Sequence, residues 1–370
     1  METDLRLAHA CSNPPESSTC GSDTCPTDIH PYSAGTCRQA ISCYDDNGQP
    51  VDWFIIYKLP QEKRGPPETG MMYKYQDSST GGWVDGKSLM NSTAASVGRT
   101  LLQLYKFSQN QSEDLAYVLY NDQPPLEMSS TIGGHTKGVV LLDRSQGFWL
   151  VHSTPRFPPM AKDQYSWPKN GLRNGQSFLC VTYSYAQFKD IGTQLLYNNI
   201  RVFDSSVPDA FAEDLPDLSS AAKHCHVKSP PWNRQVQLDS LGGKTFVSFA
   251  KYNLFYDDLY SGWLAGALKH DLLVQFWPNS RGVLRSNCSQ PYHVFNVQSI
   301  AFPSGANFTS HVDHSKWSVS LSNSHEAWTC IGDMNRDMEE EKRGGGTVCT
   351  NDLGIWKSYR SLVTDYEPCT

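Results

Sequence analysis

No stretch of this sequence comes near the roughly 18 consecutive apolar residues that a membrane-spanning helix needs, which predicts no membrane insertion. Positive charge is also scarce: 31 Lys and Arg stand against 38 Asp and Glu, giving a formal net charge of −7. That balance argues against a strongly basic nucleic-acid-binding protein at neutral pH. Aromatic side chains, in contrast, make up 12% of the 370 residues, which excludes disorder for most of the chain and allows a large core.

The six cysteines from Cys180 onward are widely spaced and include no close pair of the zinc-finger type. Eleven cysteines in total are too many for a typical cytosolic enzyme, so we interpret them as structural disulfides rather than as metal ligands or nucleophiles. Four N-glycosylation sequons support this interpretation, and they begin at Asn91, Asn110, Asn287 and Asn307. Together, the cysteines and sequons predict a protein of the secretory route.

Residues 1–40 lack the apolar stretch of about 7–15 residues that a secretory signal contains. They hold four cysteines among Ser, Thr, Pro and acidic residues instead. We interpret this segment as a disordered leader or as a wrongly assigned first exon. A small disulfide-linked extension is the alternative.

From residue 41 onward, apolar runs rich in aromatic and β-branched residues alternate with amphipathic segments. This alternation predicts an α/β fold with mixed sheets flanked by helices. The runs expected to be strands are 51–59, 115–120, 137–142, 148–151, 179–185, 245–250, 292–301 and 316–321. The expected helices are 96–107, 186–196, 257–273 and 353–366, and the expected loops include 208–217, 229–233 and 339–346.

Two His-x-Lys triplets stand at the start of apolar runs, one in each half of the chain: His135-Thr-Lys137 and His314-Ser-Lys316. Because side chains two residues apart on a strand point to the same face, each triplet presents an imidazole beside an ammonium group. A third triplet begins at His226 but runs directly into Ser-Pro-Pro. Since proline does not continue a central strand, we expect this third triplet in a surface loop.

An imidazole beside a cation suits phosphodiester hydrolysis, and two such pairs in one site could divide the work. One imidazole attacks phosphorus and forms a phosphohistidine, while the other protonates the leaving oxygen and then activates water. The lysines stabilise the charge that develops on the phosphoryl oxygens. We assign His135 as the nucleophile and His314 as the general acid and base; the reverse assignment stays open.

The net negative charge opposes the approach of a polyanion at neutral pH, but acid changes it. Histidine titrates near pH 6.5, so full protonation of all 11 histidines changes the charge from −7 to −7 + 11 = +4. We therefore expect acidity both to favour binding of an anionic substrate and to set the protonation of the two catalytic imidazoles.

Other patterns favour other chemistries less strongly. His311-Val-Asp-His314 has the composition of a metal site, but at the start of a strand its two imidazoles would point to opposite faces. His152 lies close in sequence to the first triplet, and it either supports the phosphate site or packs in the core. No Gly-x-Ser-x-Gly motif is present, which argues against a serine hydrolase.

Several longer motifs resemble those of the deoxyribonuclease II family, in order and from about residue 41 to residue 369. The family is similar to a pseudodimeric branch of the phospholipase D superfold, which implies two halves at about 41–200 and 201–370. The motifs are Val51-Asp-Trp-Phe54, Tyr120-Asn-Asp-Gln-Pro-Pro125, Gly133-Gly-His-Thr-Lys-Gly138, Gly147-Phe-Trp-Leu-Val-His-Ser153, Asp257-Asp-Leu-Tyr-Ser-Gly-Trp263, Asp313-His-Ser-Lys-Trp317, Trp328-Thr-Cys-Ile-Gly-Asp-Met-Asn-Arg336 and Arg343-Gly-Gly-Gly346.

The resemblance implies a lysosomal acid endonuclease that needs no metal or other cofactor and leaves 3′-phosphate and 5′-hydroxyl ends on double-stranded DNA. It implies that the two triplets, His135 with Lys137 and His314 with Lys316, are catalytic. It also implies three disulfides, Cys43–Cys180, Cys288–Cys369 and Cys330–Cys349.

The pattern departs from the superfold at the groups that orient the two imidazoles. The superfold places an Asp soon after each triplet, whereas here Asp143 follows Lys137 by six residues and nothing equivalent follows Lys316. Gly332-Asp-Met-Asn335 is only loosely similar to the superfold's Gly-Ser-x-Asn, so Asn335 is a candidate supporting residue. The orienting partners, the branch of the family, the oligomeric state and the cleavage preference stay open.

Two rival functions remain. The same chemistry would serve a phosphodiesterase acting on lipids or short nucleic acids. A secreted glycoprotein that binds DNA or carbohydrate without catalysis is the second rival, and the presence of both intact triplets argues against it.

Overall fold

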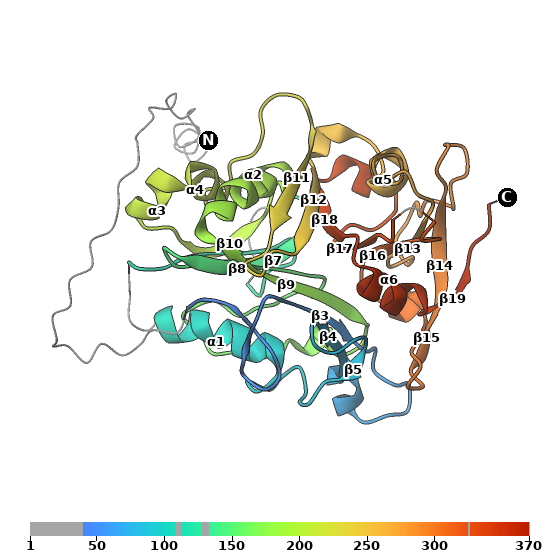
Figure 1. Ribbon diagram of the computed structural model, residues 1–370, viewed down its shortest axis with the longest axis horizontal. Helices are drawn as coiled ribbons and strands as arrows, with labels where there is room; N and C mark the ends of the chain where they lie inside the picture. Colours follow the sequence, from blue (N-terminus) through green and yellow to red (C-terminus); the bar gives the residue numbers. More distant parts are fainter. Residues whose placement is uncertain (1–39, 109–112, 127–132, 325, 370) are drawn as a thin grey trace.

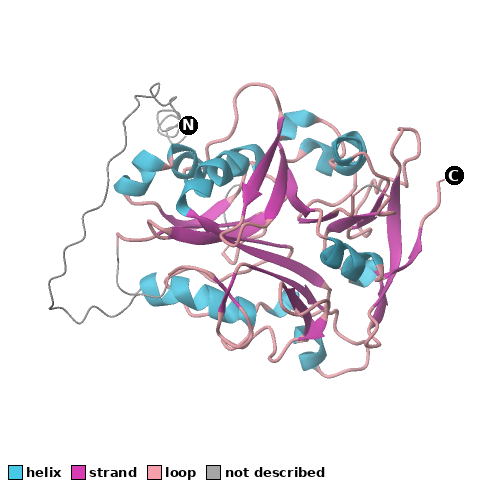
Figure 2. Cartoon of the chain, viewed as in Figure 1, coloured by secondary structure: helices cyan, strands magenta, loops and turns pink. Residues whose placement is uncertain are grey.

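A computed structural model describes residues 40–108, 113–126, 133–324 and 326–369. It confirms the α/β fold: strands form two large sheets, and helices lie mainly around their outside (Figure 2). Among the described residues, no helix has the length and apolar character to span a bilayer. The proposed leader, apart from residue 40, lies outside the described residues, as does the sequon at Asn110.

The first sheet has eight strands and is built from the first half of the chain. A short two-stranded ribbon, β1 (Cys43–Tyr44) with β2 (Pro50–Val51), precedes it. The strand order is β10 (Val202–Ser206), β6 (Ala116–Asn121), β7 (Lys137–Leu142), β8 (Gln146–His152), β9 (Gln176–Ser184), β3 (Trp53–Lys58), β4 (Tyr73–Asp77) and β5 (Val84–Asp85).

The second sheet has nine strands and comes from the second half of the chain. Its order is β11 (Asn233–Asp239), β12 (Thr245–Lys251), β18 (Gly345–Thr350), β17 (Thr329–Gly332), β16 (Trp317–Ser320), β13 (Leu272–Gln275), β14 (Val294–Ala301) and β15 (Asn307–Thr309), and β19 (Val363–Tyr366) also pairs with β14.

Five neighbouring strands follow the same order in the two sheets. The order is β6-β7-β8-β9-β3 in the first sheet and β13-β16-β17-β18-β12 in the second. In both sheets every neighbouring pair within this set is antiparallel. β7 and β16, the strands into which the two His-x-Lys triplets lead, occupy the same place in this order.

The two sheets pack face to face through a shared apolar core. Val140 and Val181 of the first sheet lie in the same buried cluster as Trp317 and Val348 of the second. The opposite face of the first sheet is covered by α1 (Ser96–Ser108), as Figure 1 shows. Four of its apolar residues, Val97, Leu101, Leu104 and Tyr105, recur at helical spacing and are buried, at about 1.5–3 kcal/mol for each large side chain.

Three disulfides join pairs of described residues that are separated in sequence. They are Cys43–Cys180, Cys288–Cys369 and Cys330–Cys349, the pairs that the family resemblance implies. The first fixes the ribbon β1–β2 to β9, and the third joins the adjacent strands β17 and β18. The bridges therefore restrain strands that form the two sheets.

Three segments differ from the sequence-based expectations. Residues 208–217, expected as a loop, contain α3 (Asp209–Asp214) and the start of α4 (Pro216–Ala222), because each proline stands at a helix start rather than within a turn. The long helix expected at 257–273 is a π-turn (Tyr260–Leu264) and the short α5 (Ala265–Leu268), which ends where Lys269 adopts a left-handed backbone, and strand β13 follows. The final helix is only α6 (Leu353–Arg360), followed by β19.

The other expected elements are confirmed to within a few residues. α1 and α2 (Phe188–Asn198) match the two expected helices of the first half. The hairpin of β7 and β8 is present, and so are β3, β6, β9, β12, β14 and β16.

Candidate catalytic site at the junction of the two sheets

The two His-x-Lys triplets meet where the sheets join, and each is held by the opposite half of the chain. The backbone N–H of His135 donates to the carbonyl of Gly344, 2.8 Å away, just before β18. In the corresponding bond, the N–H of His314 donates to the carbonyl of Gly175, 2.9 Å away, just before β9. Each half therefore supplies the backbone that receives the other half's histidine.

The alternation of side chains at the start of β16 gives the second triplet two distinct faces. Asp313 and Ser315 point toward Tyr57 of β3, whose hydroxyl donates to the Asp313 carboxylate and accepts from the Ser315 hydroxyl at 3.0 Å. His314 and Lys316 lie on the other face, with the Lys316 Nζ 2.9 Å from the His314 Nδ1. The buried network with Tyr57 thus fixes the strand that presents His314 and Lys316.

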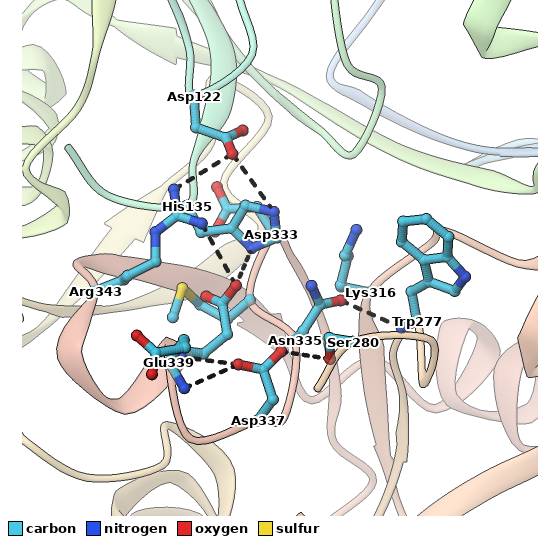
Figure 3. A network of polar contacts seen from close by, with 12 residues as sticks. Asp122, His135, Trp277, Ser280, Lys316, Asp333, Asn335, Asp337, Glu339 and Arg343 are labelled. Carbon is cyan, nitrogen blue, oxygen red and sulfur yellow. Dashed lines mark hydrogen bonds and ion pairs between the residues drawn. The ribbon is translucent and has the colours of Figure 1, made fainter. Parts of the chain in front are cut away.

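His135 lies between two carboxylates, one from each half of the chain. Its Nδ1 is 2.9 Å from Glu340 Oε1, and its Nε2 is 3.8 Å from Asp122 Oδ2. Asp122 also pairs with Lys137, and Arg343 contacts Asp122 at 3.3 Å and Glu340 at 3.6 Å. Figure 3 shows this group, with Asp122 on one side of the imidazole and Arg343 beside it.

His314 has a different environment, in which no carboxylate of the residues that the structure describes contacts the imidazole. Its Nδ1 is 3.2 Å from the carbonyl oxygen of Ser153, and the ring of Trp277 packs edge-on at 4.5 Å between centroids. The backbone N–H of Trp277 donates to Asn335 Oδ1 at 3.2 Å, a bond drawn in Figure 3. Asn335 therefore reaches the candidate site through Trp277, and its described hydrogen bonds do not include the imidazole of His135 or His314.

The strand register shows that Asp122 and Trp277 are equivalent positions. Asn121 pairs with Lys137 between β6 and β7, and Asp122 follows it. Gln275 pairs with Trp317 between β13 and β16, so continuing this register sets residue 276 opposite Lys316 and makes Trp277 the next residue. One half thus places an acid beside its histidine and lysine, and the other half places an indole.

Because of this difference, the pKa values of the two imidazoles are shifted to different extents. Burial lowers the pKa of His135, and the carboxylates of Glu340 and Asp122 oppose part of that effect. Burial also lowers the pKa of His314, but there the charges of Lys316, Lys137 and His135 act in the same direction and bring it well below its ordinary value. As the pH falls, His135 takes up a proton before His314 does.

The expected charge of +4 in acid assumes that every histidine titrates freely, but burial opposes the protonation of several of them. Burial lowers the pKa of at least five histidines, namely His135, His152, His224, His226 and His314. In the opposite sense, burial raises the pKa of Asp313 to about 6 and that of Asp333 to about 7, so these carboxyls are neutral in acid. Part of the change in charge therefore comes from carboxyl groups.

His152 and the third triplet lie apart from this arrangement. The His152 ring stacks on Phe178 with centroids 5.4 Å apart, and its Nδ1 accepts the N–H of Thr154 at 3.2 Å. These contacts favour the interpretation of His152 as a core residue. The third triplet lies outside helices and strands, as expected, and its His226 stacks on Tyr252.

The sequence alone assigned no role to four residues of the site: Asp122, Trp277, Glu340 and Arg343. Asp122 and Arg343 belong to motifs that carry the family resemblance, so their positions, although not their roles, were visible. Glu340 lies 205 residues from His135 in a charged segment, and nothing in the local pattern connects the two. Within the described ranges, no group of three or more His, Cys, Asp or Glu side chains is arranged to hold a metal ion.

Asp333 leads to a prediction about stability. It is 3% exposed and accepts the backbone N–H groups of Lys137 and Gly346, both at 3.3 Å. Its folded pKa of about 7 exceeds the unfolded value of 3.8, so its contribution to stability is complete below about pH 4 and is lost as the pH rises through 7. Between pH 5 and 7.5, the wild-type protein should lose about 3 kcal/mol more unfolding free energy than Asp333→Asn.

Urea unfolding of both proteins at the two pH values measures this difference. Asp204→Asn, at a carboxylate in β10, controls for the loss of an acid elsewhere in the first sheet. Equal pH dependence in wild type and Asp333→Asn would show that the carboxyl titrates normally.

Known proteins resemble this chain over nearly its whole length. Residues 42–369 match the family described as Deoxyribonuclease II. Deoxyribonuclease-2-alpha of Mus musculus is 51% identical over 339 residues, which cover 90% of this chain and 94% of the mouse protein. Deoxyribonuclease-2-beta of Homo sapiens is 41% identical over 331 residues, 89% of this chain and 92% of the human protein. Plancitoxin-1 of Acanthaster planci is 41% identical over 337 residues, 90% and 93% of the two chains.

Proposed function

The chain belongs to the deoxyribonuclease II family, and from this premise we propose that it hydrolyses double-stranded DNA in acid, without a metal ion, at the site formed by the two His-x-Lys triplets. The observation that carries the proposal is the meeting of the triplets, each held by a backbone bond from the opposite half. The four side chains His135, Lys137, His314 and Lys316 are each at most 5% exposed. Contact is therefore restricted to a small group such as a phosphodiester, which suits recognition of the DNA backbone with little base preference.

The surroundings of the two imidazoles favour the reverse of the sequence-based assignment of roles. A nucleophilic imidazole must be neutral, and burial beside Lys316 keeps His314 neutral. The Nδ1 of His314 faces the carbonyl of Ser153 and the Nζ of Lys316, which leaves Nε2 as the ring nitrogen available to a substrate. A general acid must hold a proton, and His135 has a carboxylate near each ring nitrogen to stabilise the imidazolium.

The reaction then proceeds in two balanced steps. The Nε2 of His314 attacks phosphorus and forms a P–N bond, while the P–O bond to the 5′ oxygen breaks and His135 gives that oxygen its proton. In the second step neutral His135 takes a proton from water, the hydroxide attacks phosphorus, and the P–N bond breaks. The products are a 5′-hydroxyl and a 3′-phosphate, and both imidazoles return to their initial states.

Acid dependence follows from the depth of the site. Because burial lowers the pKa of His135 and of Lys316, their charged forms are favoured only when protons are abundant. An incoming phosphate anion further favours the Lys316 ammonium, which no carboxylate contacts among the described residues. The protonated site and the anionic substrate therefore stabilise each other.

The proposal also covers the two-halved architecture of the protein and its location in the cell. The repeated five-strand order supports two phospholipase D-like halves in a pseudodimer. Three disulfides and the sequons at Asn91, Asn287 and Asn307 support passage through the secretory pathway to the lysosome, with glycosylation on the way. Asn91 and Asn307 are exposed and Asn287 is half-buried.

Plasmid cleavage in excess EDTA tests the proposed chemistry. At pH 5 the protein should convert supercoiled DNA to nicked and linear forms at the same rate with and without chelator, because histidine and lysine side chains supply the chemistry. The new ends should be substrates for a phosphatase at the 3′ side and for a kinase at the 5′ side. A loss of about tenfold or more in EDTA, restored by a divalent cation, would contradict the metal-free mechanism.

A further inference from the structure

Lys251, at the end of β12, is fully buried and directs its ammonium group at backbone oxygens. Its Nζ donates to the carbonyls of Glu340 and Arg343, each at 2.8 Å, and to the carbonyl of Glu341 at 3.2 Å. No side-chain carboxylate of the described residues lies within ion-pair distance of this ammonium. The hydrogen bonds that this buried ammonium group makes among the described residues therefore all go to one turn of the chain, residues 340–343.

That turn, residues 340–343, carries the two side chains that reach across to the first half of the protein. Glu340 contacts the imidazole of His135, and Arg343 contacts both Asp122 and the carbonyl of Gly134. The turn is a single 3₁₀ unit (Glu340–Lys342), which is too short to be rigid by itself. Its geometry must come from groups outside it.

The two ends of the turn are held by opposite charges. At the start, Asp337 Oδ1 accepts the N–H groups of Glu339 and Glu340 at 3.1 and 3.0 Å, and Asp337 Oδ2 accepts the Ser280 hydroxyl (Figure 3). On the carbonyl side, the Lys251 ammonium binds three carbonyl oxygens of the turn, and that of Glu340 also accepts the backbone N–H of Arg343 at 3.2 Å. This arrangement matches the direction of the peptide dipoles, with an anion at the N–H end and a cation at the C=O end.

We propose that Lys251 is a positioning residue for catalysis: by fixing the 340–343 turn it holds the Glu340 carboxylate against His135 and so sets the pH at which His135 carries its proton. The inference rests on the proposed role of His135 as the general acid. Lys251 itself touches neither the imidazoles nor the space where a phosphate would lie.

The charge on Lys251 persists at the working pH. Burial lowers its pKa to about 8, and the carboxylates of Glu340, Asp258, Glu341 and Asp257 oppose that effect. In acid the ammonium is therefore intact and all of its donors are available. Phe255 lies over the same group at 5.9 Å, and this ring adds packing but no hydrogen bond.

The test compares pH–rate profiles for plasmid cleavage by Lys251→Met, Glu340→Gln and the double variant. Removing the Glu340 charge should lower the pKa of His135 and move the alkaline limb of the profile to lower pH by about one unit. Lys251→Met, which keeps the volume but lacks the ammonium, should move the same limb in the same direction by about half a unit or more. The double variant should move no further than Glu340→Gln, because both changes act on one contact.

Lys58→Met is the matched control. Lys58 is also fully buried and donates to backbone carbonyls, those of Leu172 and Asn174, but it lies in β3 away from the turn. It should lower the melting temperature and leave the alkaline limb where wild type has it. If Lys251→Met does not fold, Lys251→Gln, which keeps one or two of the donors, should give a smaller shift in the same direction.

The outcomes separate the inference from the function on which it rests. An unmoved limb in Lys251→Met together with a moved limb in Glu340→Gln would overturn the positioning role alone. Equal shifts in Lys251→Met and Lys58→Met would overturn it too, because general loosening would then explain both. An unmoved limb in Glu340→Gln would overturn the His135–Glu340 pairing itself, and absence of cleavage by wild type would overturn the proposed function.

Discussion

His314→Ala should abolish DNA cleavage, reducing the rate at pH 5 by about 10⁴-fold or more. The substitution removes the atom that forms the P–N bond, and no other described side chain presents a lone pair at the same place. His135→Ala should cost less, about 10²–10⁴-fold, because it removes a proton donor and not the bond-forming group. Plasmid nicking at pH 5 in EDTA measures both losses.

The third triplet provides the matched control for this prediction. His226→Ala removes an imidazole from the same His-x-Lys pattern, but in a surface loop where the ring stacks on Tyr252. It should cleave DNA at the wild-type rate. Equal rates in wild type and His314→Ala would exclude the second triplet from the site.

A substrate with a good leaving group distinguishes the two roles. A phosphodiester that releases p-nitrophenolate needs no proton on its leaving oxygen, so it should restore the first step, measured as a burst of p-nitrophenolate, in His135→Ala and not in His314→Ala. Hydrolysis of the phosphohistidine still lacks its base in His135→Ala, so turnover after the burst should stay slow. The opposite pattern, with rescue of His314→Ala alone, would show that His135 is the nucleophile.

Lys316→Met should lower the rate at the optimum by about 10²–10³-fold and also move the optimum. The ammonium stabilises the charge that develops on the phosphoryl oxygens, and loss of one such donor typically has an effect of this size. It also holds down the pKa of His314, so its removal raises that pKa and leaves His314 neutral only at higher pH. The acid limb of the pH–rate profile should therefore move toward neutral pH.

Comparison with Lys137→Met tests the asymmetry of the two halves. Asp122 already pairs with Lys137, whereas the Lys316 ammonium contacts only the Nδ1 and the carbonyl of His314 among the described residues. Lys137→Met should therefore leave Asp122 with Arg343 as its one Lys or Arg partner among the described residues and remove a positive charge near His135, which favours the protonated imidazole and moves the alkaline limb to higher pH. Limbs that stay in place in both variants would contradict the proposed division between the two imidazoles. Lys228→Met, in the surface triplet, should leave the profile unchanged.

Much of the fold was predictable because its strands are strongly apolar and its triplets stand next to them. Strands β3, β7 and β8 are almost entirely buried, so their composition identifies them without any tertiary information. The prediction of one long helix at 257–273 is wrong. The apolar residues of this segment satisfy a helical period, but the helix ends where Lys269 adopts a left-handed backbone. The prediction of a loop at 208–217 is also wrong. Proline is common in loops, but it is common at helix starts too, and the prolines at 208 and 216 stand at the starts of α3 and α4.

The candidate catalytic residues were predictable only where a local sequence pattern identifies them. Each His-x-Lys triplet is a property of three residues and one strand, so its geometry can be read from the sequence. The difference between the two imidazoles depends instead on Glu340, which comes from the other half, and on Trp277, which replaces an acid at the equivalent position. Both depend on strand register and on packing between distant segments, and one sequence does not reveal either.

The exchanged backbone bonds of His135 and His314 have a consequence for the timing of activity. During synthesis, the first half of the chain emerges with its triplet complete, but the carbonyl of Gly344 that receives His135 is still more than 200 residues away. A chain that ends before Gly344 lacks this carbonyl, and so does a fragment that holds only the first sheet. We therefore expect such copies to lack DNA cleavage activity, because they hold neither the backbone acceptor of His135 nor the second triplet.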